Sequence, residues 1–272
     1  MGNNVTDQQI EDFLSQFDSL DDGFASIAKF VRSTKAARLH PKVQPTALHT
    51  PVIISFKDVT KTYKISKQRL DALKDVSFDI HEGEIIAITG KSGSGKSTLL
   101  QLIGCLDKPT QGDILIDQKN PRKLSDNKLS QLRQNTIGFV FQSFYLQPFL
   151  KLDQNISVPA MFTHAKNKQI NESVESLLDQ VDLAEHRKHY PKELSGGQIQ
   201  RAAIARALIN KPKVILADEP TGNLDSVNSQ AIIELFKYIR DELGTTIIIV
   251  THDEQIAHQA DRVITLKDGE II

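Results

Sequence analysis

Residues 90–97 contain three glycines, three serines and two lysines, the residue types that bind the phosphates of a nucleotide. The segment reads Gly90, Lys91, Ser92, Gly93, Ser94, Gly95, Lys96 and Ser97, and it matches the pattern G-x-x-x-x-G-K-[ST]. Its glycines let backbone N–H groups point at phosphate oxygens, while Lys96 would reach the β- and γ-phosphates and Ser97 would bind Mg²⁺. A chance glycine-rich turn is the alternative. A strand pattern before the segment and a helical pattern after it favour nucleotide binding.

Two adjacent carboxylates form a second candidate group. Residues 214–217 are Val-Ile-Leu-Ala, which predicts a buried strand, and Asp218 and Glu219 follow directly. The C-terminal ends of strands are where α/β sheets bind ligands. We therefore expect Asp218 to hold Mg²⁺ through its water shell and Glu219 to orient and deprotonate the attacking water. An acidic strand end that only caps the next turn is the alternative.

Ser195, Gly196, Gly197 and Gln198 form the third group, at the start of a predicted helix. The hydroxyl and the two glycines suit an anion at the positive end of a helix, although a helix cap is the ordinary explanation. A second anion-binding helix start has no use in a site that residues 90–97 already surround. It has a use if two chains face each other, so the segment predicts a nucleotide site shared between two copies.

The elements that position these groups alternate between strands and helices from residue 52 onward. This order predicts an α/β fold with a mainly parallel sheet. Strands are expected at 52–54, 84–88, 214–217 and 245–250, antiparallel strands at 56–63 and 75–80, and a hairpin at 263–272 that turns at Asp268–Gly269. Residues 143–190 show no strand pattern and predict a helical insertion. Cys105 is expected in the core, on the helix that follows the phosphate loop.

The first 50 residues have a different pattern. Thr6 and Gln9 read as a capping box, and apolar residues then recur at helical spacing. The charged residues between them are acidic in the first part of the segment and basic in the second. We expect one or two amphipathic helices and a linker at 1–50, followed by a catalytic domain at 51–272 with a helical subdomain at about 143–195.

Composition excludes several classes of protein. The chain has 272 residues, 33 basic and 34 acidic side chains and a net charge of −1, which argues against general nucleic-acid binding. One cysteine excludes a disulfide framework. Since the sequence shows neither a secretory signal nor a membrane-spanning apolar run, we expect a cytosolic protein.

Together these motifs resemble the ATP-binding cassette family, over about residues 52–272. The resemblance implies the P-loop ATPase fold of that family, with an antiparallel β subdomain and a helical insertion, and it implies ATP and Mg²⁺ as ligands. It adds Tyr63 as the aromatic that stacks on adenine, Gln142 as a ligand of the Mg²⁺ site, Asp225 in the loop that crosses the dimer interface, and His252 as a contact of the γ-phosphate. Thr98 completes the phosphate-binding segment. Catalysis would depend on Glu219, His252, Gln142 and Lys96.

Three further segments narrow the resemblance. Residues 103–109, 141–148 and 217–225 look like those of bacterial macrolide-export, lipoprotein-release and cell-division ATPases. The resemblance implies a homodimer that drives a separately encoded membrane permease from the cytoplasmic face of the membrane, for export or mechanical coupling. An importer ATPase of the same fold is an alternative, although Asn223 favours the export group. A soluble cassette ATPase that acts on ribosomes or DNA is a second alternative, which the single compact cassette disfavours.

Overall fold

A computed structural model describes residues 50–65 and 68–272 of the chain. The helices predicted before residue 50 lie outside the described residues. The fold that follows is therefore that of the segment that holds all the candidate groups.

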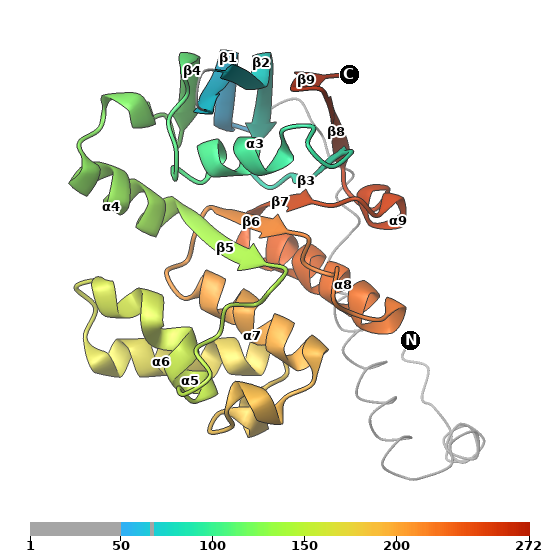
Figure 1. Cartoon of the computed structure of the whole chain (residues 1–272). Helices are drawn as coiled ribbons and strands as arrows, with labels where there is room; N and C mark the ends of the chain where they lie inside the picture. The colour runs from blue at the N-terminus through green and yellow to red at the C-terminus, as the bar shows by residue number, and fades with distance from the viewer. Residues whose placement is uncertain (1–49, 66–67) are drawn as a thin grey trace, which may run out of the picture. The chain divides into compact units, whose positions relative to one another are not determined.

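The described residues form two sheets and a set of helices (Figure 1). The strands are β1 (Val52–Ile65), β2 (Gln68–His81), β3 (Ile85–Gly90), β4 (Gln111–Ile116), β5 (Ile137–Phe141), β6 (Val214–Asp218), β7 (Thr246–Val250), β8 (Arg262–Lys267) and β9 (Glu270–Ile271). The α-helices are α3 (Lys96–Ile103), α4 (Asp126–Thr136), α5 (Leu152–Ser157), α6 (Asn167–Gln180), α7 (Gly196–Leu208), α8 (Ser226–Leu243) and α9 (Glu254–Ala257). Short 3₁₀ helices are η1 (Pro121–Lys123), η2 (Val158–Phe162), η3 (Ala184–His186) and η4 (Pro191–Glu193).

The larger sheet has the strand order β5-β6-β7-β3-β8-β9. All neighbouring pairs are parallel except β8 and β9, which form the predicted hairpin. Strands β3, β6 and β7 lie in its centre, and most of their residues are apolar because helices or sheet cover both of their faces. Successive side chains of a strand point to opposite faces, so Ile215 and Ala217 pack with α7 and α8, whereas Val214 and Leu216 pack on the side of α3. The mainly parallel α/β fold is confirmed.

The smaller sheet is antiparallel, with the order β2-β1-β4. Its strands β1 and β2 have 14 residues each and are longer than predicted. The apolar residues 52–54 belong to β1, and β2 begins earlier because residues 68–73 pair with residues 61–65 of β1. Strand β4 was not predicted, since only its last three residues, 114–116, are apolar. It pairs with β1 through Ile54 and Ile116, and both side chains are buried.

Cys105 corrects one expectation. It is buried, as predicted, but helix α3 ends at Ile103, and Cys105 has a φ of 52° in the turn that follows. The helix stops there because Gly104 and Cys105 begin a turn in which Leu106 N–H bonds back to Gln101 O at 2.9 Å. Burial raises the pKa of the Cys105 thiol to about 11, which makes it an inert core group.

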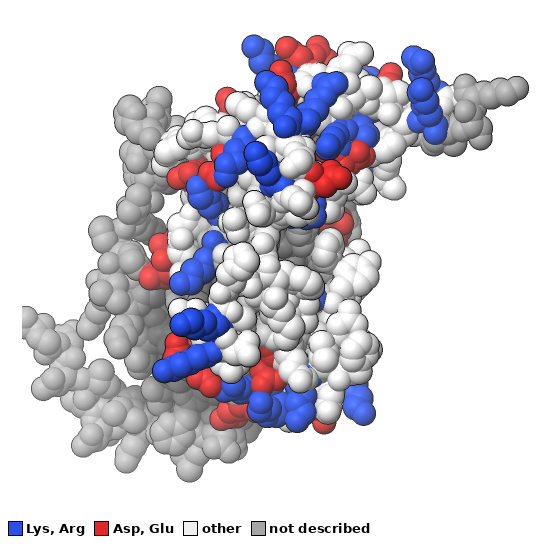
Figure 2. Space-filling view, turned by 90° about the vertical axis from the view of Figure 1, so that its left-hand side faces the viewer, with Lys and Arg blue, Asp and Glu red and all other residues white. Residues whose placement is uncertain are grey.

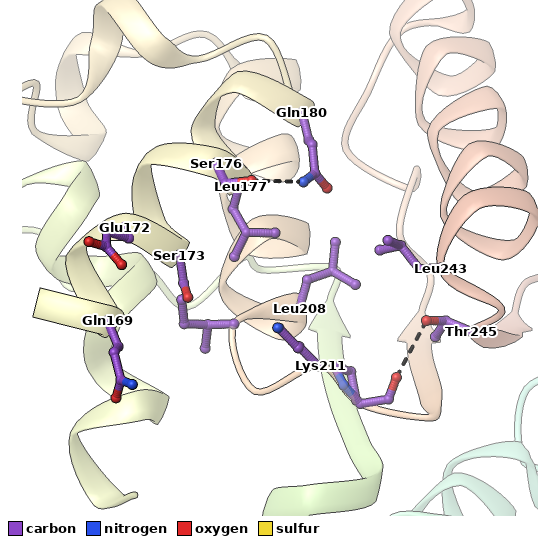
Figure 3. A pocket seen from close by; sticks show the side chains of 12 residues that line it. Gln169, Glu172, Ser173, Ser176, Leu177, Gln180, Leu208, Lys211, Leu243 and Thr245 are labelled. Atoms are coloured by element: carbon purple, nitrogen blue, oxygen red, sulfur yellow. Dashed lines mark hydrogen bonds between the residues drawn. The ribbon is translucent and has the colours of Figure 1, made fainter. Parts of the chain in front are cut away.

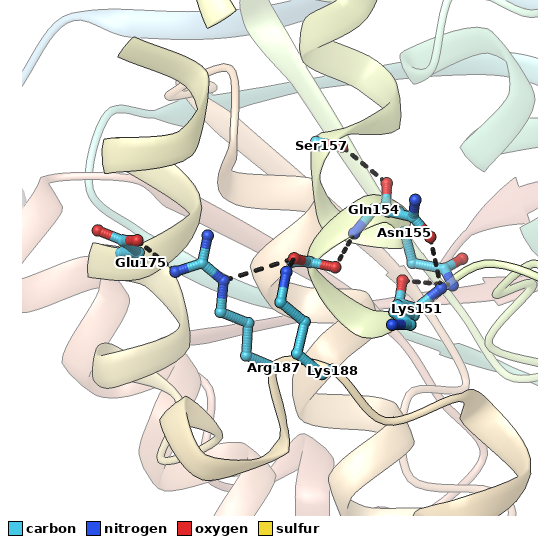
Figure 4. Close-up of polar contacts among 8 residues, drawn as sticks. Lys151, Gln154, Asn155, Ser157, Glu175, Arg187 and Lys188 are labelled. Carbon is cyan, nitrogen blue, oxygen red and sulfur yellow. Dashed lines mark hydrogen bonds and ion pairs between the residues drawn. The ribbon is translucent and has the colours of Figure 1, made fainter. Parts of the chain in front are cut away.

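Residues 143–195 contain helices and turns without a strand, and charged groups join these helices (Figure 4). Asp153 on α5 accepts from Lys188 Nζ at 2.6 Å and from Arg187 Nε at 3.4 Å. Arg187 also binds Glu175 on α6. Burial opposes the charge of Asp153, but these cations hold its pKa below the ordinary value. Among residues 50–65 and 68–272, no helix is both long and apolar enough to cross a bilayer.

Candidate functional site

The phosphate loop joins β3 to α3 in the structure. Gly90 has a φ of 147°, and a Cβ atom there would lie 2.3 Å from Leu266 O and 2.5 Å from Ser94 Oγ, so only glycine fits this position. Lys96 begins α3 and folds back over the loop, where its Nζ donates to Gly90 O at 2.7 Å and to Lys91 O at 3.0 Å. Its ammonium group therefore already lies inside the loop.

The hydroxyls of the loop have unequal surroundings. Ser92 and Ser97 are exposed and Thr98 is half-buried, whereas Ser94 is buried and its Oγ has no hydrogen-bond partner in the described part of the chain. Backbone contacts fix the segment, since Ser94 N donates to Lys91 O at 3.1 Å and Ser94 O accepts from Gly269 N at 3.1 Å. The loop is therefore held by a bond within itself and by a bond from the turn at Gly269. Ser97 is exposed to solvent, where a cation could reach it.

The carboxyl ends of four neighbouring parallel strands bring most of the predicted residues together. The phosphate loop follows β3, Gln142 follows β5, Asp218 ends β6, and His252 comes two residues after β7. Asp218 is paired in register with both Phe141 and Val250. Sheet topology thus gathers, at one edge, groups that lie up to 162 residues apart (from 90 to 252) in the sequence.

Asp218 and Glu219 lie at this edge with different surroundings. Burial, and then the neighbouring charge of Glu219, raise the pKa of Asp218, while Lys96 acts in the opposite direction. Glu219 has a φ of 47°, and its N–H donates to Val250 O at 2.9 Å. A non-glycine residue in this left-handed region is uncommon, and such residues cluster at functional sites.

His252 lies beside Glu219. Its Nδ1 is 2.8 Å from Glu219 Oε1, and the hydrogen bond followed by the carboxylate charge raises the pKa of His252. The imidazole side chain is 73% exposed and the Glu219 side chain is 17% exposed. The pair therefore presents an exposed imidazole on a shielded carboxylate, at the end of the sheet that holds the phosphate loop.

Gln142 connects this edge to the segment after Glu219. A Cβ atom at Gly222 would lie 2.8 Å from Gln142 Nε2, so the glycine allows the amide to lie against the backbone. Asn223 Nδ2 donates to Gln142 O at 2.9 Å. Asp225 caps α8 by accepting from Asn228 N at 2.8 Å, and these hydrogen bonds lower its pKa.

Ser195–Gln198 lie on the other face of the sheet. Ser195 caps α7 through a capping box, in which its Oγ accepts from Gln198 N at 3.3 Å and its N–H donates to Gln198 Oε1 at 2.8 Å. Helix α7 packs in the apolar cluster opposite the one that contains α3, and Figure 1 shows these two helices on opposite sides of the parallel sheet. Ser195 and Gly196 are exposed. The structure therefore does not bring them to the phosphate loop of their own chain.

Tyr63 lies on β1, close to α3. Its hydroxyl is 3.0 Å from Asp107 Oδ2 and 3.4 Å from Gln101 Oε1, and its ring is half-buried. It is thus near the helix that begins at the phosphate loop, although it belongs to the antiparallel sheet.

Two cavities differ in their relation to these residues. One, of 340 Å³, is lined by Glu219, Gly222, His252 and residues of α8 and α9. A larger one, of 690 Å³, lies between α6 and the ends of α7 and α8, and Figure 3 shows Leu177, Leu208 and Leu243 around it. The larger cavity contains none of the predicted site residues. Size therefore does not identify the site here, whereas the chemistry of the lining residues does.

Comparison with known proteins decides the family. Residues 73–222 match the family described as ABC transporter. The chain belongs to this family. It binds ATP and is an ATPase, as the resemblance implied.

Several relatives are similar over most of the chain. The uncharacterized ABC transporter ATP-binding protein MJ0796 of Methanocaldococcus jannaschii is 47% identical over 223 residues, which are 80% of this chain and 95% of that protein. The uncharacterized ABC transporter ATP-binding protein YknY of Bacillus subtilis is 44% identical over 220 residues, with 81% and 95% covered. The macrolide export ATP-binding/permease protein MacB of Escherichia coli is also 44% identical over 220 residues, but these are only 34% of MacB.

A solved structure of MJ0796 supports the fold. It is a dimeric post-hydrolysis state bound to ADP and Pi, with a TM-score of 0.73 and 44% identity over 80% of this chain and 96% of that chain. The match confirms the cassette fold for this ATPase.

Sequence reasoning missed two polar residues of α7, the buried Gln200 and the half-buried Arg206. Gln200 is fully buried, and its Nε2 donates to Pro220 O at 2.6 Å, directly after Glu219. Arg206 donates to the carbonyls of Phe144 and Tyr145, and burial lowers its pKa. They tie α7 to the segments that follow Glu219 and Gln142. A polar residue inside the otherwise apolar stripe of α7 was the available signal for Gln200.

Proposed function

We propose that two copies of this chain close head to tail around two ATP molecules with Mg²⁺, and that the resulting hydrolysis cycle drives a membrane permease. The observation that carries the proposal is the separation of two anion-binding helix starts. Lys96 begins α3 on one face of the parallel sheet, whereas exposed Ser195 caps α7 on the other. A second copy would bring its Ser195–Gln198 segment to the phosphates held by the first.

Residues 90–98 bind the phosphates in this proposal. Backbone N–H groups and the N-terminal end of α3 supply partial positive charge, and Lys96 supplies a full one. Because Lys96 Nζ already lies 2.7 Å from Gly90 O, it needs only to exchange loop carbonyls for phosphate oxygens. Tyr63 would stack on the adenine.

Ser97, Gln142 and Asp218 would hold the Mg²⁺. The donor set fits a hard cation because it consists of hydroxyl, amide and carboxylate oxygens. Burial disfavours the charged form of Asp218, and a bound cation would favour it again. When bound, Mg²⁺ neutralises charge on the phosphate oxygens.

Glu219 would act as the general base and His252 as its positioning partner. Glu219 is held by its backbone bond to Val250 and by His252 Nδ1, so the carboxylate has a fixed place from which to accept a proton of water. The exposed side of the imidazole would contact the γ-phosphate. Asp225, in the loop between Glu219 and α8, would lie at the interface of the two copies.

Exposed apolar residues in the segment that follows Gln142 in the sequence support a protein partner. Tyr145, Phe149, Met161 and Phe162 are 64%, 72%, 63% and 79% exposed. Asn155 holds the loop that carries Phe149, because its Nδ2 donates to Gln147 O, Leu150 O and Lys151 O and its Oδ1 accepts from Gln147 N. A rigid loop with exposed apolar groups suits a docking surface. Figure 2, which views the molecule from the side of α4 and α6, shows a broad uncharged area between groups of lysines and arginines.

We infer that this partner is a separately encoded permease of the export or mechanical-coupling type, with the ATPase on the cytoplasmic face of the membrane. The sequence similarity to the ATPase segment of MacB supports export. A nucleic-acid partner is not part of the proposal.

The proposal is tested with the purified full chain. Lys96→Ala should lower MgATP hydrolysis by at least about 10²-fold, because the phosphates lose their side-chain cation. Exposed Lys57→Ala is the matched control and should leave the rate unchanged. Phe149→Asp should keep the basal rate and lose stimulation by the reconstituted permease. Full activity of Lys96→Ala would contradict the nucleotide site, and full stimulation of Phe149→Asp would contradict the docking surface.

A further inference from the structure

Asp107 joins the two parts of the molecule that would hold the two ends of ATP. It lies four residues after the end of α3, the helix that begins at the phosphate loop. Two side chains of β1 reach its carboxylate: Lys61 Nζ lies 2.7 Å from Oδ1, and the Tyr63 hydroxyl lies 3.0 Å from Oδ2. The same carboxylate therefore contacts the strand that carries Tyr63, the residue predicted to stack on adenine.

Lys61 is unusually buried for a lysine, with 9% of its surface exposed. A buried ammonium group needs compensating partners. Lys61 has three: the Asp107 carboxylate, Lys108 O at 2.8 Å and the ring of Tyr63, whose centroid lies 4.9 Å from Nζ. The ion pair and the ring contact thus form one packed group.

The hydrogen bonds of this group fix which atom donates. Burial opposes the charge of Asp107, but Lys61, the Lys108 N–H and Tyr63 hold its pKa below the ordinary value. Burial and then the Asp107 carboxylate raise the pKa of Tyr63. Tyr63 therefore keeps its proton and donates it to a charged acceptor, which makes a strong hydrogen bond.

We propose that Lys61 and Asp107 are positioning residues that hold the Tyr63 ring in the orientation in which it receives the nucleotide base. Asp107 fixes the hydroxyl end of the ring, and Lys61 lies over one of its faces. The ring then has little rotational freedom to lose when the base binds. The proposal rests on the proposed function, in which Tyr63 stacks on adenine.

The expected consequence is specific to the base. Loss of the hydroxyl anchor should weaken ATP binding by roughly 2- to 10-fold, the range for ordering one side chain. Binding of inorganic tripolyphosphate should not change, because this ligand has phosphates and no base. A merely structural role of Asp107 in the turn after α3 would weaken the binding of both ligands alike.

The experiment measures Kd for MgATP and for magnesium tripolyphosphate on the full chain. Tyr63→Phe removes only the anchored hydroxyl and leaves the Lys61–Asp107 pair intact, and Asp107→Asn keeps the shape and removes the charge. Both should lower the preference for ATP, which is the Kd for tripolyphosphate divided by the Kd for ATP, by about 2- to 10-fold. Both changes remove the Tyr63–Asp107 hydrogen bond, so in the double variant their effects on the preference for ATP should overlap instead of adding in full. Exposed Asp79→Asn is the matched control.

Tyr63→Ala separates the two levels of the proposal. If it leaves the preference for ATP unchanged, Tyr63 does not stack on adenine as the proposed function states, and the positioning role is wrong as well. If Tyr63→Ala lowers the preference but Tyr63→Phe does not, the stacking of Tyr63 on adenine is supported and the positioning role is overturned. If Asp107→Asn fails to fold, as judged by circular dichroism, the result for Tyr63→Phe decides.

Discussion

His252 Nδ1 lies 2.8 Å from Glu219 Oε1, so the carboxylate that follows β6 and the imidazole that follows β7 form one polar unit. Because these strands are adjacent and parallel, the pair is set by sheet register rather than by a flexible loop. The carboxylate stabilises the protonated imidazole and raises the pKa of His252.

The first prediction concerns this pKa. Glu219→Gln should lower the pKa of His252 toward its ordinary value of about 6.5, because the amide keeps a hydrogen bond but carries no charge. The raised value means that His252 in the unmodified chain stays protonated to a higher pH, and the ion pair is lost as the pH rises through that value. Imidazole NMR titration of the nucleotide-free chain measures it. The same pKa of His252 in the two proteins would show that the Glu219 carboxylate does not raise it.

The second prediction concerns turnover. Glu219→Gln should bind MgATP normally, hydrolyse it at least about 10²-fold more slowly and accumulate as an ATP-bound dimer, because an amide cannot accept the proton of water. Phosphate release and light scattering after size exclusion give the two readouts. Exposed Glu172→Gln on α6 is the control. Hydrolysis by Glu219→Gln near the unmodified rate would remove Glu219 from the role of base.

The third prediction concerns the charged group between α5 and α6. Asp153→Asn should lower the free energy of unfolding at pH 7 by about 1–2 kcal/mol, since Lys188 and Arg187 lose their shared carboxylate and are themselves partly exposed. The pKa of Asp153 is lower in the folded chain than in the unfolded chain. Its charge therefore stabilises the fold fully above about pH 4, and this stabilisation is lost as the pH falls through the pKa of the folded state. The difference between the two proteins should therefore shrink at pH 3.

Urea unfolding at pH 7 and pH 3 checks this, with exposed Asp179→Asn as the control that should behave like the unmodified chain at both pH values. An effect of Asp153→Asn that is the same at pH 3 and pH 7 would assign it to packing instead of charge.

The fourth prediction concerns the first 46 residues. All candidate site residues lie at or after Tyr63, so deletion of residues 1–46 should leave basal ATPase activity within a few-fold. The ATPase rate of the truncated chain is compared with that of the full chain at equal concentration. A truncated chain that folds but does not hydrolyse ATP would place this segment in the catalytic unit.

Much of the site was predictable because its residues are tied to strand ends. The loop at 90–97 and the pair Asp218–Glu219 each follow an apolar strand, so their common edge follows from a parallel sheet. The positions of Lys61, Asp107 and Gln200 were not predictable, because their partners come from distant segments: Lys61 meets Asp107 across 46 residues and Gln200 meets Pro220 across 20. Strand β4 was also missed, because an edge strand with few apolar residues has a weak sequence pattern.

Mixed dimers test the shared nucleotide site most directly. Lys96→Ala disables the phosphate loop, and Ser195→Arg blocks the helix start that would face the partner's nucleotide. Each variant alone forms two defective sites, whereas a mixed dimer has one site with both defects and one intact site. ATP-dependent dimerisation, measured by light scattering on verified mixtures, should therefore recover in part when the two folded variants are combined. If verified heterodimers gain no ATP-dependent stability over either variant alone, the nucleotide does not lie between two copies of this chain.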